Sequence, residues 1–423
     1  MSQRVNQLVN RLANRLTLLG LLTACMLWLA SCGGGSGSSG VSTGSNGGDG
    51  STSGAPANNV QAIVVDSGPA AAGGTINEPF VSVTICSPNA PTNCQTIDHI
   101  LVDTGSTGLR ILSSVISTSL ALPQQTDSNG NAVVECTSFA DGYSWGPIKS
   151  VNLRIAGETA NGLAVQVIGD PAFASQVPQT CSASGAPENT VASFGANGVL
   201  GVGLFAQDCG GACAQNANVN VYYLCSTSFC QSSTLSLVQQ LQNPITLFAS
   251  DNNGVIVALP AIAVAGADSV SGTMIFGIGT QSNNGLGIAM VYTANPDNGF
   301  ITTTYKGVAY PDSFLDSGSN GLYFNDASIP QCSDGSGFYC PGSTLNLTAL
   351  ISGANSHQTS IAFSVGNALS AEGSSISAYR LLAGTNGDPS SFDWGLPFFF
   401  GRNVYTAIEN RSTPGGNGPY FAF

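Results

Sequence analysis

Residues 103–111 read Asp-Thr-Gly-Ser-Thr-Gly-Leu-Arg-Ile, and residues 316–324 read Asp-Ser-Gly-Ser-Asn-Gly-Leu-Tyr-Phe. Five of these nine positions are identical. An apolar run precedes each copy, Ile100-Leu101-Val102 in the first case and Phe314-Leu315 in the second. Each half of the chain therefore places one carboxylate where a predicted strand enters a tight turn. Two carboxylates in equivalent positions predict a pair that faces across a cleft, where it can activate water without a metal.

The composition is that of a packed globular protein. The chain has 423 residues, of which 43% are hydrophobic and only 8% are charged. This balance argues against a disordered chain. Short apolar runs alternate with Gly, Asn, Asp and Pro, and helical periodicity is scarce, so an all-β fold is predicted. The formal net charge of −13 argues against nucleic acid or an anionic lipid surface as a partner.

Residues 1–31 have the pattern of an export signal. Three arginines are followed by an apolar run from Leu16 to Ala30, which is short for a membrane span of about 20 residues. The run ends in Leu-Ala-Ser before Cys32, which resembles the bacterial lipobox, where the Cys becomes the lipidated first residue of the mature protein. The alternative is an ordinary signal peptide followed by an incidental Cys. The lipobox predicts an exported protein that contacts the membrane only through its N-terminal lipid. By the same resemblance, Gly33 after Cys32 favours the outer membrane.

The remainder divides into a tether and two predicted lobes. Residues 32–59 are rich in Gly and Ser and predict a flexible tether. An N-terminal lobe is expected over residues 60–283 and a C-terminal lobe over residues 284–423. A short helix is expected near residues 234–241, and the apolar C-terminus is expected to dock in the core. The predicted strands include residues 61–65, 79–85, 98–102, 245–249, 255–259, 273–276, 360–365 and 376–382.

The cysteine count predicts disulfides. The chain has twelve cysteines, and two of them, Cys25 and Cys32, precede the folded part. An even remainder of ten in an exported protein is typical of disulfide bonding. Connectivity does not follow from sequence alone, but sequence neighbours suggest four pairs and leave a fifth. These pairs are Cys86–Cys94, Cys209–Cys213, Cys225–Cys230, Cys332–Cys340 and Cys136–Cys181. A zinc site is the alternative, against which stand the absence of a Cys-x-x-Cys motif and a total of two histidines.

Together with the two Asp turns, three further segments resemble the pepsin-like aspartic proteases. Residues 197–201, Asn-Gly-Val-Leu-Gly, are similar to the apolar-apolar-Gly element that crosses behind the family's first catalytic loop. Residues 271–277 resemble the strand that ends its first lobe, and residues 395–409 resemble its C-terminal segment. The resemblance covers nearly all of the chain after the tether. It looks closest to an exported bacterial branch of undetermined function.

The resemblance implies a two-lobed fold with pseudo-twofold lobes, a cleft between them, and hydrolysis of peptide bonds in an extended peptide or unfolded protein. Asp103 and Asp316 would be the catalytic pair, sharing one proton and titrating as a unit. We expect a monomer that uses no cofactor and no metal. The supporting residues would be Thr104 and Ser317, which bond across to the opposite turn; Gly105 and Gly318, which permit the sharp turns; and Ser106 and Ser319, which bind the outer carboxylate oxygens.

Three departures from the family pattern favour a different reading. The family's flap hairpin carries Tyr-Gly at its tip, whereas the candidate flap residues here are Phe139, Asp141, Gly142 and Tyr143. Phe139 takes the usual Tyr position unless Tyr143 substitutes for it, and the alternative for both is ordinary hairpin packing. Arg110 stands where the family commonly has Trp, and residues 393–395, Asp-Trp-Gly, replace an apolar-apolar-Gly element. The alternative function is a catalytically weak or inactive binding or surface-interaction lipoprotein, and a purely structural envelope component is a third.

Other candidate motifs are weaker. Residues 64–68, Val-Val-Asp-Ser-Gly, also match the pattern of a single catalytic turn, but Pro69 follows where the motif has Ser or Thr. A Ser-His-Asp triad would have to use His99 or His357, and no Gly-x-Ser-x-Gly elbow accompanies either histidine.

Overall fold

The computed structural model describes residues 58–140, 142–371 and 375–423. Strands dominate these ranges and the α-helices are short, which confirms the all-β prediction. In the described part of the chain, no helix combines the length and apolar character needed to cross a membrane. Residues 1–31, Cys32, the tether as far as residue 57, and Asp141 lie outside the described residues. The α-helices are α2 (Gln179–Ser182), α3 (Val191–Phe194) and α4 (Gly210–Gln215).

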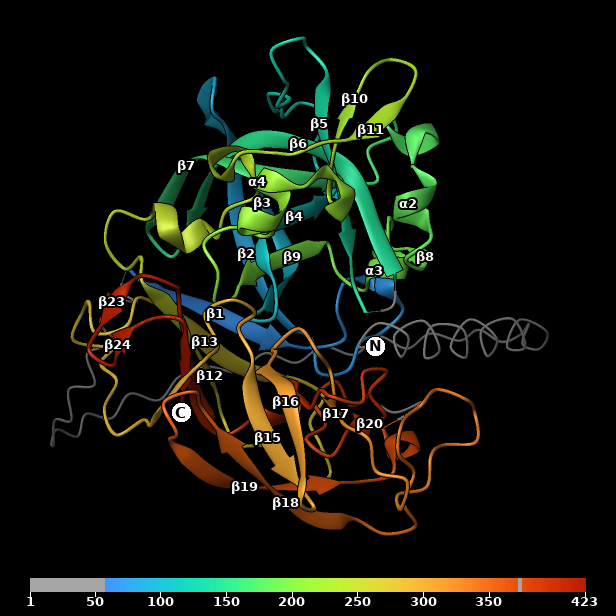
Figure 1. Ribbon diagram of the computed structural model, residues 1–423, viewed down its shortest axis with the longest axis vertical. Coiled ribbons are helices and arrows are strands. Elements are labelled where there is room, and N and C mark those ends of the chain that lie inside the picture. The colour runs from blue at the N-terminus through green and yellow to red at the C-terminus, as the bar shows by residue number, and fades with distance from the viewer. Residues whose placement is uncertain (1–57, 141, 372–374) are drawn as a thin grey trace, which may run out of the picture.

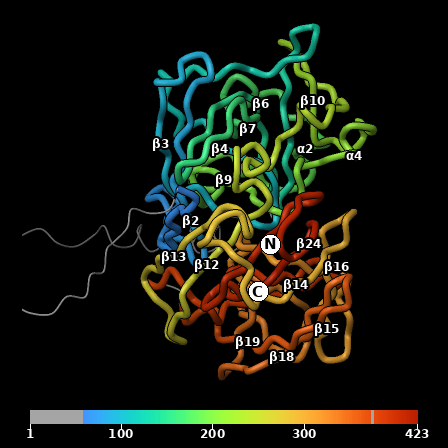
Figure 2. The backbone as a smooth tube through the Cα atoms, turned by 90° about the vertical axis from the view of Figure 1, so that its left-hand side faces the viewer, coloured from blue at the N-terminus to red at the C-terminus, as the bar shows by residue number. Residues whose placement is uncertain are grey.

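Six antiparallel strands at one end of the larger, 16-stranded sheet run across the middle of the molecule (Figure 1) and come from both ends of the chain; this section is called the six-stranded sheet. Figures 1 and 2 both place β3, β6 and β7 on one side of this sheet and β15, β18 and β19 on the other. The sheet therefore joins the two halves of the sequence. Its order is β1 (Val60–Val65), β13 (Val270–Phe276), β12 (Gly254–Leu259), β22 (Arg402–Ala407), β25 (Tyr420–Ala422) and β14 (Val291–Thr293).

The same four-strand arrangement occurs once in each half. In the first half, β3 (Ala90–Asp103) runs parallel to β9 (Gly198–Val202), which is antiparallel to β4 (Thr107–Leu112), which is parallel to β7 (Glu158–Ile168). The second half repeats these directions with shorter strands. The sequence repeat is thus also a repeat of topology. The second set is β16 (Val308–Leu315), β21 (Asp393–Trp394), β17 (Leu322–Tyr323) and β20 (Ala383–Gly384).

Glycine is required where β9 and β21 pass behind the two Asp turns. A Cβ atom on Gly201 would lie 2.6 Å from the backbone nitrogen of Thr107. A Cβ atom on Gly395 would lie 2.1 Å from the carbonyl oxygen of Gly321. Only glycine allows two backbones to approach this closely. Gly201 and Gly395 therefore allow these two segments to pack directly against the backbones of the two Asp turns.

The other strands extend these units. The larger sheet also contains β2 (Pro79–Ser87), β5 (Ala132–Ser138), β6 (Gly142–Ile155), β8 (Ala186–Pro187), β10 (Tyr222–Cys225) and β11 (Cys230–Ser232). The smaller sheet adds β15 (Ile301–Tyr305), β18 (Leu345–Ser352) and β19 (Gln358–Val365), and β23 (Ser412–Thr413) pairs with β24 (Gly416–Asn417). Single 3-10 turns cover Ala70–Ala72, Ser113–Val115, Ala174–Gln176, Ala217–Val219, Leu237–Gln239, Pro244–Leu247, Ala368–Ser370 and Leu396–Phe398.

Stacked aromatic rings fill the core of the second half. The ring of Phe392 lies 4.7 Å from that of Phe324 and 4.4 Å from that of Trp394, in both cases stacked. The indole nitrogen of Trp394 donates to the Thr303 hydroxyl at 2.9 Å. Such contacts hold β21 rigidly beside the second Asp turn. Phe421, two residues before Phe423, is 1% exposed, so the C-terminal strand β25 is docked in the core as expected.

Four local expectations differ from the structure. Residues 245–249 form part of a 3-10 turn rather than a strand, because Pro244 has no N–H for a ladder and the Asn243 side chain accepts from Ile245 N. Residues 376–382 form no continuous strand: Ala378 makes an isolated bridge with Ala267, and the Asn77 side chain binds the backbone of Tyr379. The helix near residues 234–241 is a single 3-10 turn. Asn59, expected in the tether, is fully buried and donates to the Phe276 carbonyl at 2.9 Å.

The ten cysteines of the described residues form five disulfides, and all five suggested pairs are confirmed. Cys86–Cys94 links the paired strands β2 and β3, and Cys225–Cys230 links β10 and β11. Cys136–Cys181 ties the β5–β6 hairpin to α2, across 45 residues of chain. Five disulfides indicate an oxidising compartment outside the cytosol.

Candidate active site

Asp103 is the last residue of β3, and the turn that follows surrounds its carboxylate with donors. The backbone N–H groups of Gly105 and Ser106 donate to Oδ1 at 2.7 and 3.1 Å. The Ser106 hydroxyl donates to Oδ2 at 2.5 Å. The residue is only 8% exposed. This carboxylate is therefore held in one orientation by its own turn.

Asp316 follows β16 and has the same surroundings. The backbone N–H of Gly318 donates to Oδ1 at 2.8 Å, and the Ser319 hydroxyl donates to Oδ2 at 2.7 Å. These two bonds match the Gly105 N–H and Ser106 hydroxyl bonds of Asp103, whereas the Ser319 N–H donates to the backbone carbonyl of Asp316 at 3.3 Å. The two turns are thus alike in side-chain chemistry as well as in sequence.

Thr104 and Ser317 connect the two turns. The Ser317 N–H donates to Thr104 Oγ1 at 2.9 Å, and the Thr104 N–H donates to Ser317 Oγ at 3.2 Å. Each hydroxyl then donates to the strand that enters the opposite turn, Thr104 to the Leu315 carbonyl at 3.1 Å and Ser317 to the Val102 carbonyl at 2.7 Å. Both residues are buried. Four hydrogen bonds therefore fix the distance between the turns.

The structure brings the two carboxyl groups together. A Cβ atom on Gly105 would lie 2.7 Å from Cγ of Asp316, and one on Gly318 would lie 2.8 Å from Cγ of Asp103. Burial raises the pKa of Asp316 well above its usual range, and the charge of Asp103, the charge of Asp393 and a hydrogen bond with Asp103 raise it further. Two acids this close cannot both ionise at low cost, so the pair retains one proton between them.

Two hollows flank the turns. One, of about 130 Å³, is lined by the first turn together with Gly203, Leu204 and Phe205. The other, of about 300 Å³, lies beside the second turn and includes Ser319 and Asp393. Phe300 and Phe314 line both hollows, so the two are neighbours. The first Asp turn contributes to one lining and the second to the other, although neither Asp103 nor Asp316 is among the described lining residues.

The β5–β6 hairpin reaches this region through Ala140, which lines the larger hollow. Of the candidate flap residues, Phe139 packs edge-on against Phe194 with ring centroids 5.6 Å apart. Tyr143 is 7% exposed and belongs to a cluster with Trp145. Gly142 pairs with β8, where a Cβ atom would lie 2.3 Å from the Ala186 carbonyl oxygen. Neither Phe139 nor Tyr143 is among the described residues that line the two hollows, and Asp141 lies outside the described residues.

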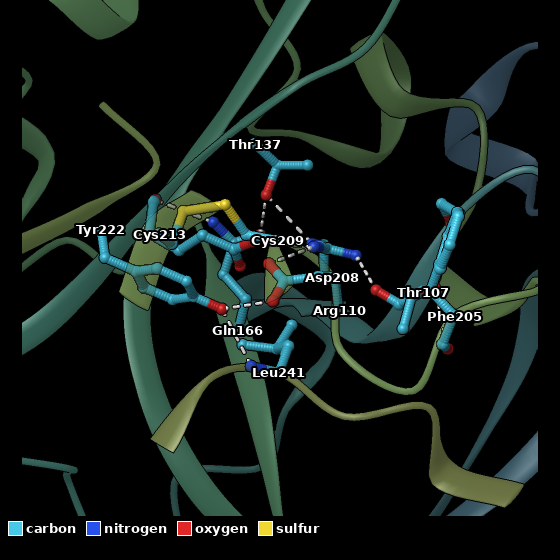
Figure 3. Close-up of polar contacts among 12 residues, drawn as sticks. Thr107, Arg110, Thr137, Gln166, Phe205, Asp208, Cys209, Cys213, Tyr222 and Leu241 are labelled. Atoms are coloured by element: carbon cyan, nitrogen blue, oxygen red, sulfur yellow. Dashed lines mark hydrogen bonds and ion pairs between the residues drawn. A yellow bond between two sulfur atoms is a disulfide. The ribbon is translucent and has the colours of Figure 1, made fainter. Parts of the chain in front are cut away.

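Arg110 is at the centre of a buried ionic cluster, shown in Figure 3. Its guanidinium contacts Glu135 at 2.7 Å and Asp208 at 3.5 Å, and it donates to the Thr107 carbonyl at 2.9 Å. Its Nε donates to the hydroxyl of Thr137 at 3.0 Å. These contacts join β4, which leaves the first Asp turn, to β5 of the hairpin. Arg110, which stands where the pepsin-like proteases commonly have Trp, therefore connects the first Asp turn to the candidate flap.

The contacts within this cluster shift the pKa of Arg110 and that of Asp208. Burial opposes the charge of Arg110, but Glu135 and Asp208 raise its pKa above the usual value. Burial, and then the neighbouring Glu135, raise the pKa of Asp208 well above its usual range. Tyr222 donates to Asp208 at 2.7 Å. One buried atom of the cluster, Oε2 of Glu135, has no hydrogen-bond partner. Because the contacts of Arg110 join β4 to the hairpin, we assign the cluster a positioning role.

Asp393 and Ser391 are site residues that sequence reasoning did not assign. Both line the larger hollow and are 6% and 4% exposed. Burial raises the pKa of Asp393 to about 7. The sequence offered one indication that Asp393 is a site residue: it is an acid within an apolar segment, at a position where the pepsin-like proteases have an apolar residue.

A third cavity, of about 360 Å³, lies elsewhere, against β19 and the segment that precedes β22. Arg380 and Arg402 line it, and its described lining contains no acidic side chain. The histidines are also remote from the pair: His99 contacts Asp66 and Asp98, and His357 bonds Asn355 and the Val291 carbonyl. Among the described residues, no three His, Cys, Asp or Glu side chains are grouped to hold a metal ion.

A comparison with protein-family models matches residues 55–423 to one family, described as "Protein of unknown function (DUF3443)". The chain belongs to this family. The match covers both Asp turns, the hairpin and the two hollows, so the whole site lies within the family domain. A search of curated proteins found no match.

Proposed function

We propose that this protein is a pepsin-like aspartic endopeptidase with two lobes and a cleft between them. One observation carries the proposal: Asp103 and Asp316 face each other, each held by its own turn, and are joined by the Thr104–Ser317 bonds. The repeated four-strand arrangement and the six-stranded sheet that joins both halves support the fold. A catalytic pair of this kind must retain one proton at its working pH, and the raised pKa of Asp316 supports that condition.

In the proposed reaction, the ionised carboxyl of the pair removes a proton from a water molecule, whose oxygen attacks the carbonyl carbon of the peptide. The protonated carboxyl donates to the carbonyl oxygen as negative charge develops there. The C–N bond then breaks as the amide nitrogen takes a proton, which yields a carboxylic acid and an amine. The pair ends with one shared proton, as it began. The donors from Gly105, Ser106, Gly318 and Ser319 keep both carboxyl groups oriented throughout.

The substrate would be an extended peptide or an unfolded protein. Phe300 and Phe314 supply apolar surface in both hollows beside the pair. A groove of this kind suits side chains on either side of the cleaved bond. The protein would work outside the cytosol, held by lipid on Cys32, in the outer membrane.

One observation favours a second candidate, a binding lipoprotein with little or no activity. Neither aromatic residue of the candidate flap lines the hollows beside the pair. Without an aromatic side chain over the substrate, a peptide would be held less firmly for attack. Whether the protein cleaves peptide bonds distinguishes the endopeptidase from the binding lipoprotein.

The test is cleavage of an unfolded protein by the purified full chain, from about pH 3 to about pH 7. Wild type is compared with Asp103→Asn and Asp316→Asn. Asp66→Asn is the matched control, because Asp66 also precedes Ser-Gly and accepts from Gly68 N at 2.9 Å but lies outside the pair. The enzyme predicts cleavage that both catalytic variants lose and the control retains. A folded wild type that cleaves at no pH would support the binding protein.

A further inference from the structure

The hollow beside the second Asp turn is acidic. Three acidic side chains line it, those of Asp312, Asp388 and Asp393, and its described lining includes no Lys, Arg or His. Among the described residues, none of these three acids forms an ion pair with a basic side chain. A negative field in a partly enclosed hollow attracts cations.

At the open end, Asp312 and Asp388 lie around one hydroxyl group. Ser390 Oγ is 2.7 Å from Asp312 Oδ2 and 2.6 Å from Asp388 Oδ1. A serine hydroxyl has one proton and can donate to only one of them. The Ser390 N–H donates to Asp388 at 2.9 Å. These bonds hold the two carboxylates side by side without neutralising their charge.

At the deep end, two buried polar atoms have no hydrogen-bond partner. They are Oδ1 of Asp393 and Oγ of Ser391, in residues that are 6% and 4% exposed. Buried polar atoms are almost always bonded, and an unbonded one in a pocket wall is a position for a ligand group. Asp393 pairs with Phe314 in the sheet, so the backbone fixes its side chain beside the Asp316 turn.

The walls between these ends are partly apolar, since Phe300 and Phe314 contribute to the lining. This layout matches a side chain with an aliphatic stem and a cationic tip. A bare metal ion fits less well, because the described acids are not grouped closely enough to coordinate one. The donors of Lys or Arg can reach separated acceptors.

We propose that this hollow is a specificity pocket for a Lys or Arg side chain of the peptide, next to the bond that the Asp103–Asp316 pair would cleave. The proposal rests on the proposed function for the cleavage, but the recognition of the cation is a separate property of the pocket. Asp393 and Ser391 would accept hydrogen bonds from the cationic tip. Asp312 and Asp388 would attract the cation from solvent.

The experiment measures binding first, on the full chain carrying Asp103→Asn, which removes cleavage and does not alter the lining of the pocket. The probes are octapeptides that are identical except for Lys, norleucine or Glu at one scanned position. At the position that enters the pocket, we expect the Lys peptide to bind at least about tenfold more tightly than the norleucine peptide. Adding Asp393→Asn should remove that preference, while adding Asp268→Asn, an exposed acid outside the pocket, should keep it.

Thermal melts of each variant establish that it is folded before binding is compared. The proposed specificity would be ruled out if the three peptides bound equally at every scanned position, or if none of the peptides bound. The same peptides are then offered to the wild-type chain. Selective binding of Lys without cleavage would contradict the enzyme and leave the pocket intact, whereas cleavage with no preference for Lys or Arg would contradict the pocket and leave the enzyme intact.

Discussion

Thr104 and Ser317 exchange hydrogen bonds between the two Asp turns, the Ser317 N–H donating to Thr104 Oγ1 at 2.9 Å and the Thr104 N–H to Ser317 Oγ at 3.2 Å. This relationship connects two turns that come from opposite halves of the chain. It also explains how two acids that repel each other can stay in contact, since four buried bonds hold their backbones together.

Thr104→Val should therefore weaken both the fold and the activity. Valine keeps the shape but leaves the Ser317 N–H and the Leu315 carbonyl without their partner. We expect a loss of about 1–3 kcal/mol in the free energy of unfolding, measured by urea denaturation. Thr96→Val is the control, because its hydroxyl makes an exposed bond with Thr84. Equal and small effects of the two variants would contradict a holding role for Thr104.

Gly105→Ala and Gly318→Ala should reduce cleavage without unfolding the protein. Either new methyl group would lie less than 3 Å from the carboxyl of the opposite acid and would push the pair apart. A misplacement of this size can lower kcat/KM by about 100-fold. Gly285→Ala, where a Cβ atom meets nothing within 4 Å, should retain the wild-type rate. Retention of the wild-type rate by Gly105→Ala would mean that the acids need not be in contact.

Arg110→Met should be strongly destabilising, because it leaves Glu135 and Asp208 buried without a cation. We expect a loss of about 3–5 kcal/mol in denaturant unfolding. Lys306 provides the contrast, because its side chain is 54% exposed where it pairs with Asp326, and Lys306→Met should cost less than about 1 kcal/mol. A mild effect of Arg110→Met would show that the cluster does not hold the hairpin.

The disulfides and the Asp turns were accessible from sequence because each depends on local spacing. Short Cys separations predicted four pairs, and only Cys136–Cys181 required elimination. The paired Asp turns were visible because both copies kept the same polar residues. Asp393 was not assigned from the sequence, because only the fold brings Asp393, Ser391 and the distant Phe300 into the lining of one hollow. Arg110 was noticed as a departure, but its partners lie on β5 and beyond β9.

The misassigned segments have a common cause. Residues 376–382 have strand-like composition, but the side chain of Asn77, 302 residues before Tyr379, binds the Tyr379 backbone, and Ala378 forms an isolated bridge with Ala267. Residues 245–249 are apolar, but a capping Asn and a Pro begin a 3-10 turn there. In both cases an Asn side chain bonds the backbone of the segment, which a pattern of apolar residues does not report.

Two acids, Asp393 and Glu158, should each make the folded state less stable as the pH rises from about 4 to about 8. Burial raises the pKa of Asp393 from 3.8 to about 7, and burial together with Asp251 raises that of Glu158 from 4.5 to about 7. Between the unfolded and folded values, the folded protein holds a proton that the unfolded chain has released. The stabilisation is therefore complete below the unfolded pKa and is lost as pH rises through the folded one.

Melting temperatures across this pH range check the sign. Asp393→Asn and Glu158→Gln should each reduce the loss of stability relative to wild type, because neither amide titrates. Asp268→Asn, which removes an exposed acid, should leave the slope unchanged. A steeper loss in the Asp393 variant would contradict the raised pKa.

The pH profile of kcat/KM for one cleaved peptide tests the central claim most directly. The account predicts a bell-shaped profile for wild type, because one acid must be ionised while the other holds the proton. It predicts that Asp103→Asn and Asp316→Asn each lower kcat/KM at least about 1000-fold at the optimum, while Asp66→Asn leaves it unchanged. Cleavage that persists when either Asp103 or Asp316 is replaced would contradict the account.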